Sequence, residues 1–240
     1  MKRIIYMILK SLLVAPYYLV ALCYHSSKRH LNYDKAYVIC RKIVARALKT
    51  GNIELEIMGK DKLPLEDGYL ITPNHQGMFD MLIMMNVFKK CIAFIPKIEI
   101  ANVFVLKQVI AGTGSICIDR NDIKQSMKVI IKVSDEIKAG KNFVIFPEGT
   151  RSRDGNNILD FKGGSFKSAM RVKAPIVPCA LIDSYKVLDT NSIKPVKVTA
   201  IFLDPIYPKE YEGMTTTDVA IVVKEKIENK ISEYLKTVDN

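Results

Sequence analysis

Residues 144–152 read Val-Ile-Phe-Pro-Glu-Gly-Thr-Arg-Ser. The first three residues, Val144–Phe146, are a short apolar run of the kind that forms a strand buried on both faces. Pro147 and Gly149 then turn the chain into a loop, because both residue types interrupt regular structure. That loop carries three polar side chains, which are Glu148, Thr150 and Arg151. A buried strand that opens into a polar loop is typical of α/β folds, whose βα loops carry functional groups.

Strand-like and helix-like segments alternate on both sides of this stretch. Besides Phe143–Phe146, the predicted strands are Ile53–Ile57, Tyr69–Thr72, Ser115–Ile118, Ile176–Ile182 and Val196–Leu203. Apolar residues at helical spacing predict helices at Tyr33–Lys49, Asp80–Phe88, Ile98–Ile110, Ser165–Val172 and Thr217–Leu235. The first of these ends at Gly51, and Thr217 caps the last. A further helix is predicted between a cap at Asp122 and a stop at Gly140. We therefore predict an α/β domain with a mixed, mainly parallel sheet flanked by helices.

The composition limits the class of partner. The chain has 240 residues, 49% of them hydrophobic and 25% charged, which fits one globular domain with an appendage and excludes a disordered chain. A formal net charge of +11 favours polyanionic partners. There is no zinc-finger spacing, no aromatic-rich basic strand pair and no Trp, so we expect no nucleic acid and favour an anionic membrane surface or phosphorylated substrates. Five scattered cysteines without C-x-x-C spacing predict reduced thiols and no metal site.

The first thirty residues differ from the rest. Apolar runs at Ile4–Leu9 and Leu12–Tyr24 are flanked by Lys and Arg, and no acidic residue precedes Asp34. Lys10 and Pro16 interrupt the roughly 20 apolar residues that a spanning helix needs. We therefore predict a membrane-anchoring helical segment at residues 1–30, lying in one leaflet, and a separate folded domain at residues 31–240. A spanning helix and a helix packed on the domain are the alternatives.

His75 is the candidate catalytic base. It lies in Asn74-His75-Gln76-Gly77-Met78-Phe79-Asp80, between a predicted strand and a predicted helix, whereas His25 and His30 lie in the basic N-terminal segment. Five residues along a helix are offset by roughly 140°, so His75 and Asp80 meet only if His75 precedes the helix that Asp80 begins. Asp80 then holds one ring nitrogen and leaves the other to accept a hydroxyl proton. The alternative is that Asp80 only caps the helix.

The blocks Asn74–Asp80 and Val144–Ser152 together resemble the glycerolipid acyltransferase family, in particular its bacterial 1-acylglycerol-3-phosphate acyltransferases, in their order and separation. Gly114–Arg120 and Ala174–Cys179 resemble two further blocks of that family, so the resemblance runs from Met58 to Pro178. Phe161-Lys162-Gly163-Gly164 also resembles its turn after the loop, with a second Gly where a small residue such as Ala is expected.

The resemblance implies that His75 is the general base and Asp80 its orienting partner. It implies that the substrate-binding residues are Asn74, Lys97, Gly114, Arg120, Glu148, Gly149, Thr150 and Arg151. Lys97 is equally well explained as a surface lysine, and Glu148 and Arg151 as an ion pair with each other. Because Arg120 and Arg151 follow predicted strands, we expect both to converge near His75 on a phosphomonoester.

The implied reaction transfers a fatty acyl group from acyl-CoA or acyl carrier protein to the sn-2 hydroxyl of lysophosphatidate, giving phosphatidate. It needs no cofactor, no metal and no covalent acyl-enzyme, and the sequence has no G-x-S-x-G elbow. We expect the protein at the cytoplasmic membrane with its catalytic domain on the cytosolic face. Acylation of glycerol-3-phosphate or another lysolipid, and a non-catalytic lipid-binding protein, are the alternatives.

Overall fold

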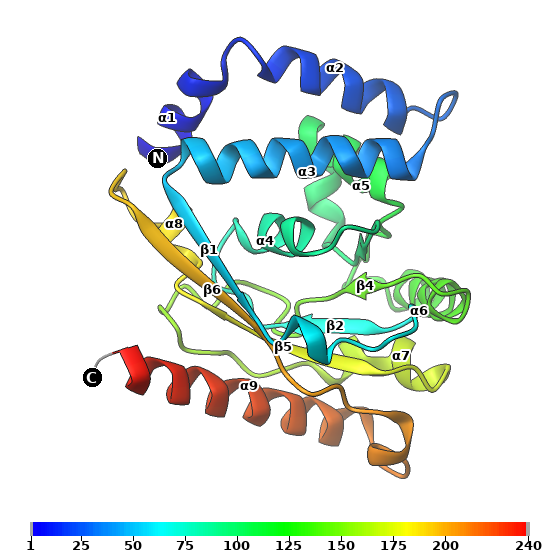
Figure 1. The fold of residues 1–240 in the computed structure, drawn as a ribbon. Helices are drawn as coiled ribbons and strands as arrows, with labels where there is room; N and C mark the ends of the chain where they lie inside the picture. The colour runs from blue at the N-terminus through cyan, green and yellow to red at the C-terminus, as the bar shows by residue number, and fades with distance from the viewer. Residues whose placement is uncertain (1, 239–240) are drawn as a thin grey trace.

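The computed structural model describes residues 2–238, which form one mixed sheet of six strands with helices on both faces (Figure 1). The strand order is β1-β6-β5-β2-β4-β3. The strands are β1 Ile53–Met58, β2 Leu70–Pro73, β3 Ala93–Phe94, β4 Phe143–Val144, β5 Ile176–Ile182 and β6 Val196–Phe202. Strands β5, β2, β4 and β3 are parallel; β6 is antiparallel to β5, and β1 is parallel to β6. The predicted α/β class with a mainly parallel sheet is confirmed.

Helices cover the sheet from both sides (Figure 1). One side carries α1 Lys2–Ser11, α2 Ala15–Ser26, α3 Tyr33–Thr50, α4 Asp80–Val87 and α5 Phe104–Thr113, and the other α6 Ile123–Lys138, α7 Lys167–Arg171 and α9 Thr216–Val238. A short helix, α8 Tyr185–Leu188, follows β5. Alternate strand residues face opposite sides, so Leu70 packs in the core under α9 and its neighbour Ile71 in the core under α3 and α4.

Some predicted segments differ from the structure. The predicted helix Ser165–Val172 begins within the 3₁₀ turn Gly163–Phe166 and continues as α7. The predicted helix Ile98–Ile110 is divided into a 3₁₀ turn, Ile98–Asn102, and α5, because Val103 between them is extended. The predicted strand Ser115–Ile118 is extended and bonded by its backbone to Phe94 and Pro96, but it forms only the isolated bridge Lys97–Ile118. It lies beside β3, which has two residues and is too short for an apolar pattern to reveal.

Most helix ends follow the local signals. The Asp122 side chain caps α6 by accepting a hydrogen bond from the Gln125 N–H, and Gly51 ends α3, as predicted. The predicted cap of the last helix is wrong by two residues. The Thr215 hydroxyl, not that of Thr217, accepts the N–H of Asp218, and α9 begins at Thr216.

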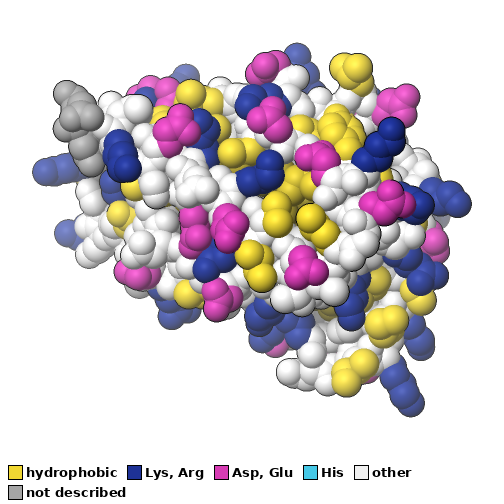
Figure 2. Space-filling view, turned by 90° about the horizontal axis from the view of Figure 1, so that it is seen from below, with side chains coloured by type: hydrophobic (Ala, Val, Ile, Leu, Met, Phe, Trp, Pro, Cys, Tyr) yellow, Lys and Arg dark blue, Asp and Glu magenta, His cyan; other side chains and the backbone are white. Residues whose placement is uncertain are grey.

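The N-terminal helices pack on the domain with one face and leave large apolar side chains exposed. Leu22 of α2 is fully buried against the core, whereas Leu13 between the two helices is 95% exposed. Within residues 2–238 no single helix is long and apolar enough to cross a bilayer; α1 and α2 together reach that length and composition, but they are bent by 87°. By contrast, the face seen from below, on the α9 side, mixes positive and negative side chains (Figure 2).

Candidate active site

The site lies at the edge of the sheet where the parallel strands end. His75 follows β2, Glu148 follows β4 and Ser184 follows β5. Because β4, β2 and β5 are neighbouring parallel strands, their carboxyl ends meet at one edge, which is where α/β sheets place ligand sites. Three segments that are far apart in sequence are therefore brought together by the sheet itself.

His75 and Asp80 form the centre of this site. His75 precedes α4 and Asp80 is its first residue, so the loop brings the two side chains together with Nδ1 and Oδ2 2.8 Å apart. The carboxylate can only accept, so it fixes the ring proton on Nδ1 and leaves Nε2 with a free lone pair. The His75 side chain is 20% exposed and that of Asp80 is fully buried, so the imidazole reaches the surface while its partner does not.

Asp80 is held by three further donors. The Gln76 and Gly77 N–H groups donate to Oδ2 at 2.7 and 3.0 Å, and the Ser184 hydroxyl donates to Oδ1 at 2.6 Å. Together with His75, these donors give the buried carboxylate four hydrogen bonds, which compensate for its removal from water. Asp80 therefore holds the His75 ring and does not only begin the helix.

Ser184 is the residue of this site that the sequence pattern does not reveal. It is fully buried and lies 104 positions from Asp80. The preceding residue, Asp183, has a φ of +62°, which turns the chain sharply after β5, and Asn156 holds that turn by bonding both the Asp183 N–H and its carboxylate. The Gln76 side chain links this turn to the His75 loop, since it accepts the Ser184 N–H and donates to Asn156.

Glu148 supports the backbone on the other side of His75. It is 2% exposed, and its carboxylate accepts the N–H of His75 at 2.6 Å and that of Leu159 at 3.0 Å. Burial raises the pKa of Glu148 to about 7, although these two N–H groups pull it down. Just before it, the Phe146 ring stacks on His75 with centroids 4.3 Å apart. Glu148 does not pair with Arg151, so that alternative for the two side chains is wrong.

Arg120 braces the loop of residues 144–152. Its Nη1 donates to the carbonyl oxygen of Gly149 at 2.7 Å, and Gly149 has a φ of +76°. A Cβ at this position would collide with the Arg120 guanidinium, so both the backbone angle and the close approach require glycine. The Gly149 N–H donates to Phe146, which means that it is already used within the loop.

The two arginines do not converge. Arg120 lines a hollow beside α6, whereas Arg151 pairs with Asp189 at 3.4 Å and lines a different hollow beside α8. The expectation that both meet one phosphate near His75 is therefore not met, because Arg120 bonds the Gly149 carbonyl whereas Arg151 pairs with Asp189.

The remaining candidates have other surroundings. Asn74 is fully buried, and its amide bonds both the N–H and the carbonyl oxygen of Leu181, so it ties β2 to β5. Gly114 ends α5 with a φ of +63°. Lys97 is half-exposed and pairs with Glu99 at 2.6 Å, and Thr150 is exposed on the loop.

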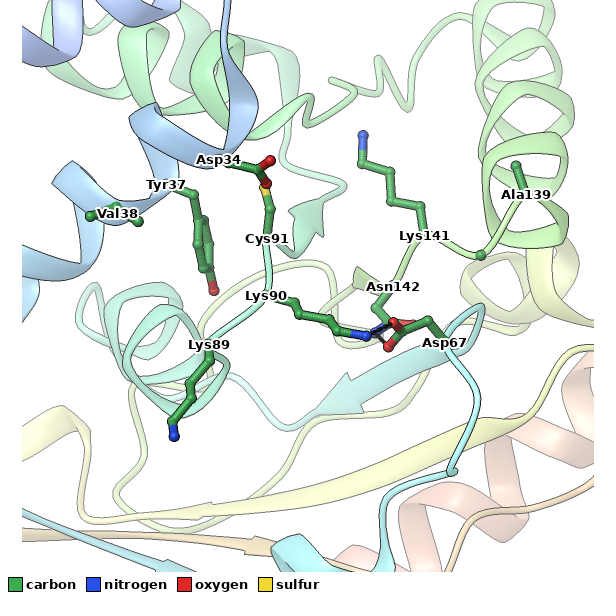
Figure 3. Close-up of a pocket in the computed structure, with 11 residues that line it drawn as sticks. Asp34, Tyr37, Val38, Asp67, Lys89, Lys90, Cys91, Ala139, Lys141 and Asn142 are labelled. Atoms are coloured by element: carbon green, nitrogen blue, oxygen red, sulfur yellow. Dashed lines mark hydrogen bonds and ion pairs between the residues drawn. The ribbon is translucent and has the colours of Figure 1, made fainter.

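A hollow of about 430 Å³ lies at the opposite edge, where β2, β3 and β4 begin (Figure 3). Its three lysines do not converge: Lys90 pairs with Asp67 at 2.6 Å, Lys141 pairs with Glu136, and Lys89 points away from both (Figure 3). At this end of the sheet, Asp67 before β2 contacts Lys90 before β3 and Asn142 before β4. Among residues 2–238, no His–Asp pair lies at this end.

Comparison with known proteins agrees with this arrangement. A family model described as Acyltransferase matches residues 54–182, more than half of the chain. The 1-acyl-sn-glycerol-3-phosphate acyltransferase of Helicobacter pylori is 29% identical over 168 residues, covering 70% of this chain and 68% of that protein. The Escherichia coli protein of the same name is 29% identical, with 69% and 67% covered.

Among solved structures, the 1-acyl-sn-glycerophosphate acyltransferase PlsC from Thermotoga maritima superposes with a TM-score of 0.76. The two sequences are 22% identical, and the match covers 98% of each chain, so it extends the shared fold to the N-terminal helices. The family match covers most of the sheet. The chain therefore belongs to the acyltransferase family.

Proposed function

We propose that this protein transfers a fatty acyl group from an acyl thioester to the sn-2 hydroxyl of 1-acylglycerol-3-phosphate, giving phosphatidate. The observation that carries the proposal is the His75–Asp80 pair at 2.8 Å, with the other ring nitrogen free and the imidazole partly exposed. The bacterial relatives at 29% identity, all named for this activity, supply the acceptor.

The geometry supports direct transfer. Nε2 of His75 takes the acceptor hydroxyl proton as that oxygen attacks the thioester carbonyl carbon, and a C–O bond forms. When the tetrahedral intermediate collapses, the C–S bond breaks and the imidazolium gives its proton to the leaving thiolate. The Asp80 carboxylate stabilises the positive charge that forms on the ring. No residue of the protein is acylated, and the proton that His75 takes from the hydroxyl leaves with the thiol in the same turnover.

The test uses the purified full chain with an acyl thioester and lysophosphatidate, with phosphatidate measured as product. Glycerol-3-phosphate and a phosphate-free monoacylglycerol serve as competing acceptors. Preferential turnover of lysophosphatidate supports the proposal, and preferential turnover of glycerol-3-phosphate assigns a different acceptor. Binding of lysolipid without any turnover would make this a lipid-binding protein and reject the enzyme.

Arg151 is proposed to bind the acceptor phosphate. Arg151→Ala removes one charge-assisted contact, worth roughly 1.5–3 kcal/mol, so kcat/KM for lysophosphatidate should fall about ten- to a hundredfold. The loss should be much smaller for monoacylglycerol under matched micelle conditions. Asp189→Ala is the matched control, since it breaks the Arg151–Asp189 pair but keeps the arginine charge. Equal losses on both acceptors, reproduced by Asp189→Ala, would mean that Arg151 only holds the loop.

The exposed side chains of α1, of α2 and of the turn between them are proposed to lie in one leaflet of the cytoplasmic membrane, with the site on the cytosolic face. Leu12 and Leu13 are 61% and 95% exposed, so Leu12→Asp with Leu13→Asp should leave the fold intact. Because each leucine contributes about 1.5–3 kcal/mol when buried, partition to anionic vesicles should fall at least about tenfold. Co-sedimentation measures this, with Leu65→Asp, at a fully exposed leucine of the domain, as control. Unchanged partition would reject this surface, and complete release of the wild type by salt would assign a purely electrostatic tether.

A further inference from the structure

We propose that a groove beside the loop of residues 144–152, here called the catalytic loop, binds the phosphopantetheine end of the acyl donor. The groove lies on the α6 side of this loop, and the inference rests on the proposed function. The groove has a volume of about 380 Å³ and lies between α6, the turn Gly163–Phe166 and the segment that carries Arg120. Its lining residues are Ile118, Arg120, Ile123, Ser126, Met127, Ile130, Ile145, Lys162, Gly164, Ser165 and Lys167.

The lining suits an apolar chain that ends in an anion. Five lining residues are apolar, and two of them, Ile123 and Met127 on α6, leave 79% and 45% of their surface uncovered. Three are cationic, and none is acidic. Glu99 lies close enough to act on Arg120, whereas Lys162 and Lys167 have no acidic residue in this lining. These two cations lower the free energy of a bound phosphate, and uncovered apolar side chains gain by burial against a ligand. Phosphopantetheine has this chemistry, because a flexible amide chain joins its phosphate to the thioester sulfur.

The groove adjoins the reaction centre through two hydrogen bonds to the catalytic loop. On one wall the backbone N–H of Lys162 donates to the Pro147 carbonyl at 3.0 Å, and on the other Arg120 donates to the Gly149 carbonyl. Pro147 and Gly149 flank Glu148, whose carboxylate accepts the His75 N–H. A donor whose phosphate meets the ammonium groups of Lys162 and Lys167 can then extend along the groove wall formed by Arg120, so that its thioester end reaches the loop beside His75.

The position of the groove relative to the N-terminal helices distinguishes donor from acceptor. The hollow that contains Arg151, about 740 Å³, also includes Asn191, and the Lys2 N–H of α1 bonds the Asn191 side chain at 3.2 Å. That hollow is thus next to α1, from which a lysolipid held in a leaflet would arrive. The groove is lined by residues of α6. That helix covers the other side of the sheet from α1 (Figure 1), which suits a donor that arrives from water. Two cationic hollows on opposite sides of one loop match a reaction with two phosphate-bearing substrates.

The test reverses the groove's charges and measures the KM for each substrate separately. Lys162 and Lys167 are exposed, so Lys162→Glu with Lys167→Glu should fold, and the Lys162 backbone bond is unaffected by the change. Each exposed lysine–phosphate contact is weak by itself, but charge reversal replaces attraction of the donor phosphate by repulsion. The KM for acyl-CoA should therefore rise about five- to thirtyfold. KM for lysophosphatidate should not change. Lys132→Glu, on the same helix but outside the groove, is the matched control and should alter neither value.

Two further arms make the result decisive. Acyl carrier protein shares the phosphopantetheine arm with coenzyme A, so KM should rise with both donors; a rise confined to acyl carrier protein would overturn the proposal and place the lysines on the carrier's protein surface. A rise in the lysophosphatidate KM, or no change in either, also overturns it. Calorimetry with unacylated coenzyme A tests the groove without turnover. The wild type should bind coenzyme A, and the charge-reversed variant should bind it more weakly. If this holds but lysophosphatidate is not acylated, the proposed acceptor is rejected while the proposed donor groove stands.

Discussion

His75→Ala is expected to lower kcat by about 10²–10⁴-fold, the usual contribution of a general base, with little change in the KM for lysophosphatidate. The loss follows from the pairing of Nδ1 with Asp80, which leaves Nε2 as the ring atom that can take the acceptor proton. The fold should persist, because the Glu148 and Ser152 contacts of position 75 involve its backbone. Phosphatidate formation and a thermal melt on the same preparation measure both expectations.

Two controls sharpen this result. His30→Ala removes an exposed histidine of the N-terminal segment and should leave kcat unchanged, since its ring stacks only on Tyr24. Added imidazole should restore part of the activity of His75→Ala, because the vacated space beside Phe146 can hold a free base. A folded His75→Ala protein that retains a near wild-type rate would reject direct transfer by this residue.

The sequence predicted the part of the site that is local in the chain. A histidine between a buried strand and a helix that begins with aspartate can be read from residues 70–80, because the apolar run, the loop and the helix start are all local signals. Asn74 was also found in this block, but its amide bonds Leu181 across the sheet, a contact set by the pairing of β2 with β5. Local patterns do not contain that pairing.

The parts that the sequence did not predict depend on long-range geometry. Ser184 reaches Asp80 because β5 lies next to β2 and Asp183 takes a left-handed turn, and neither fact is visible in residues 176–184. The separation of Arg120 from Arg151 follows from the path of the loop at Gly149, where the carbonyl oxygen faces Arg120. Strand order predicts which loops meet at an edge, but not which way a side chain points from its loop.

Asp80→Asn isolates the charge of the carboxylate from its shape. The amide oxygen can keep the Oδ2 position, where it accepts from His75, Gln76 and Gly77. The new NH₂ group then faces the Ser184 oxygen, which can accept because a hydroxyl has two lone pairs. The Ser184 proton turns to the Gln76 side-chain oxygen, which lies 3.0 Å away. The network thus offers partners to the asparagine oxygen and one acceptor to its NH₂ group, and the variant should fold.

With the geometry preserved, Asp80→Asn should still lower kcat by about 10²-fold or more, though less than His75→Ala does, because the imidazolium that forms as His75 takes the proton loses its buried counter-charge. The KM for lysophosphatidate should change little, as Asp80 is fully buried and does not reach the acceptor. Ser184→Ala with Asp80→Asn provides the matched comparison: it removes the acceptor for the new NH₂ group, so the double variant should unfold at a lower temperature than Asp80→Asn alone while its kcat falls little further. Asp80→Asn with wild-type kcat would show that the carboxylate serves only to begin α4, and the role of His75 as an oriented base would then lose its support.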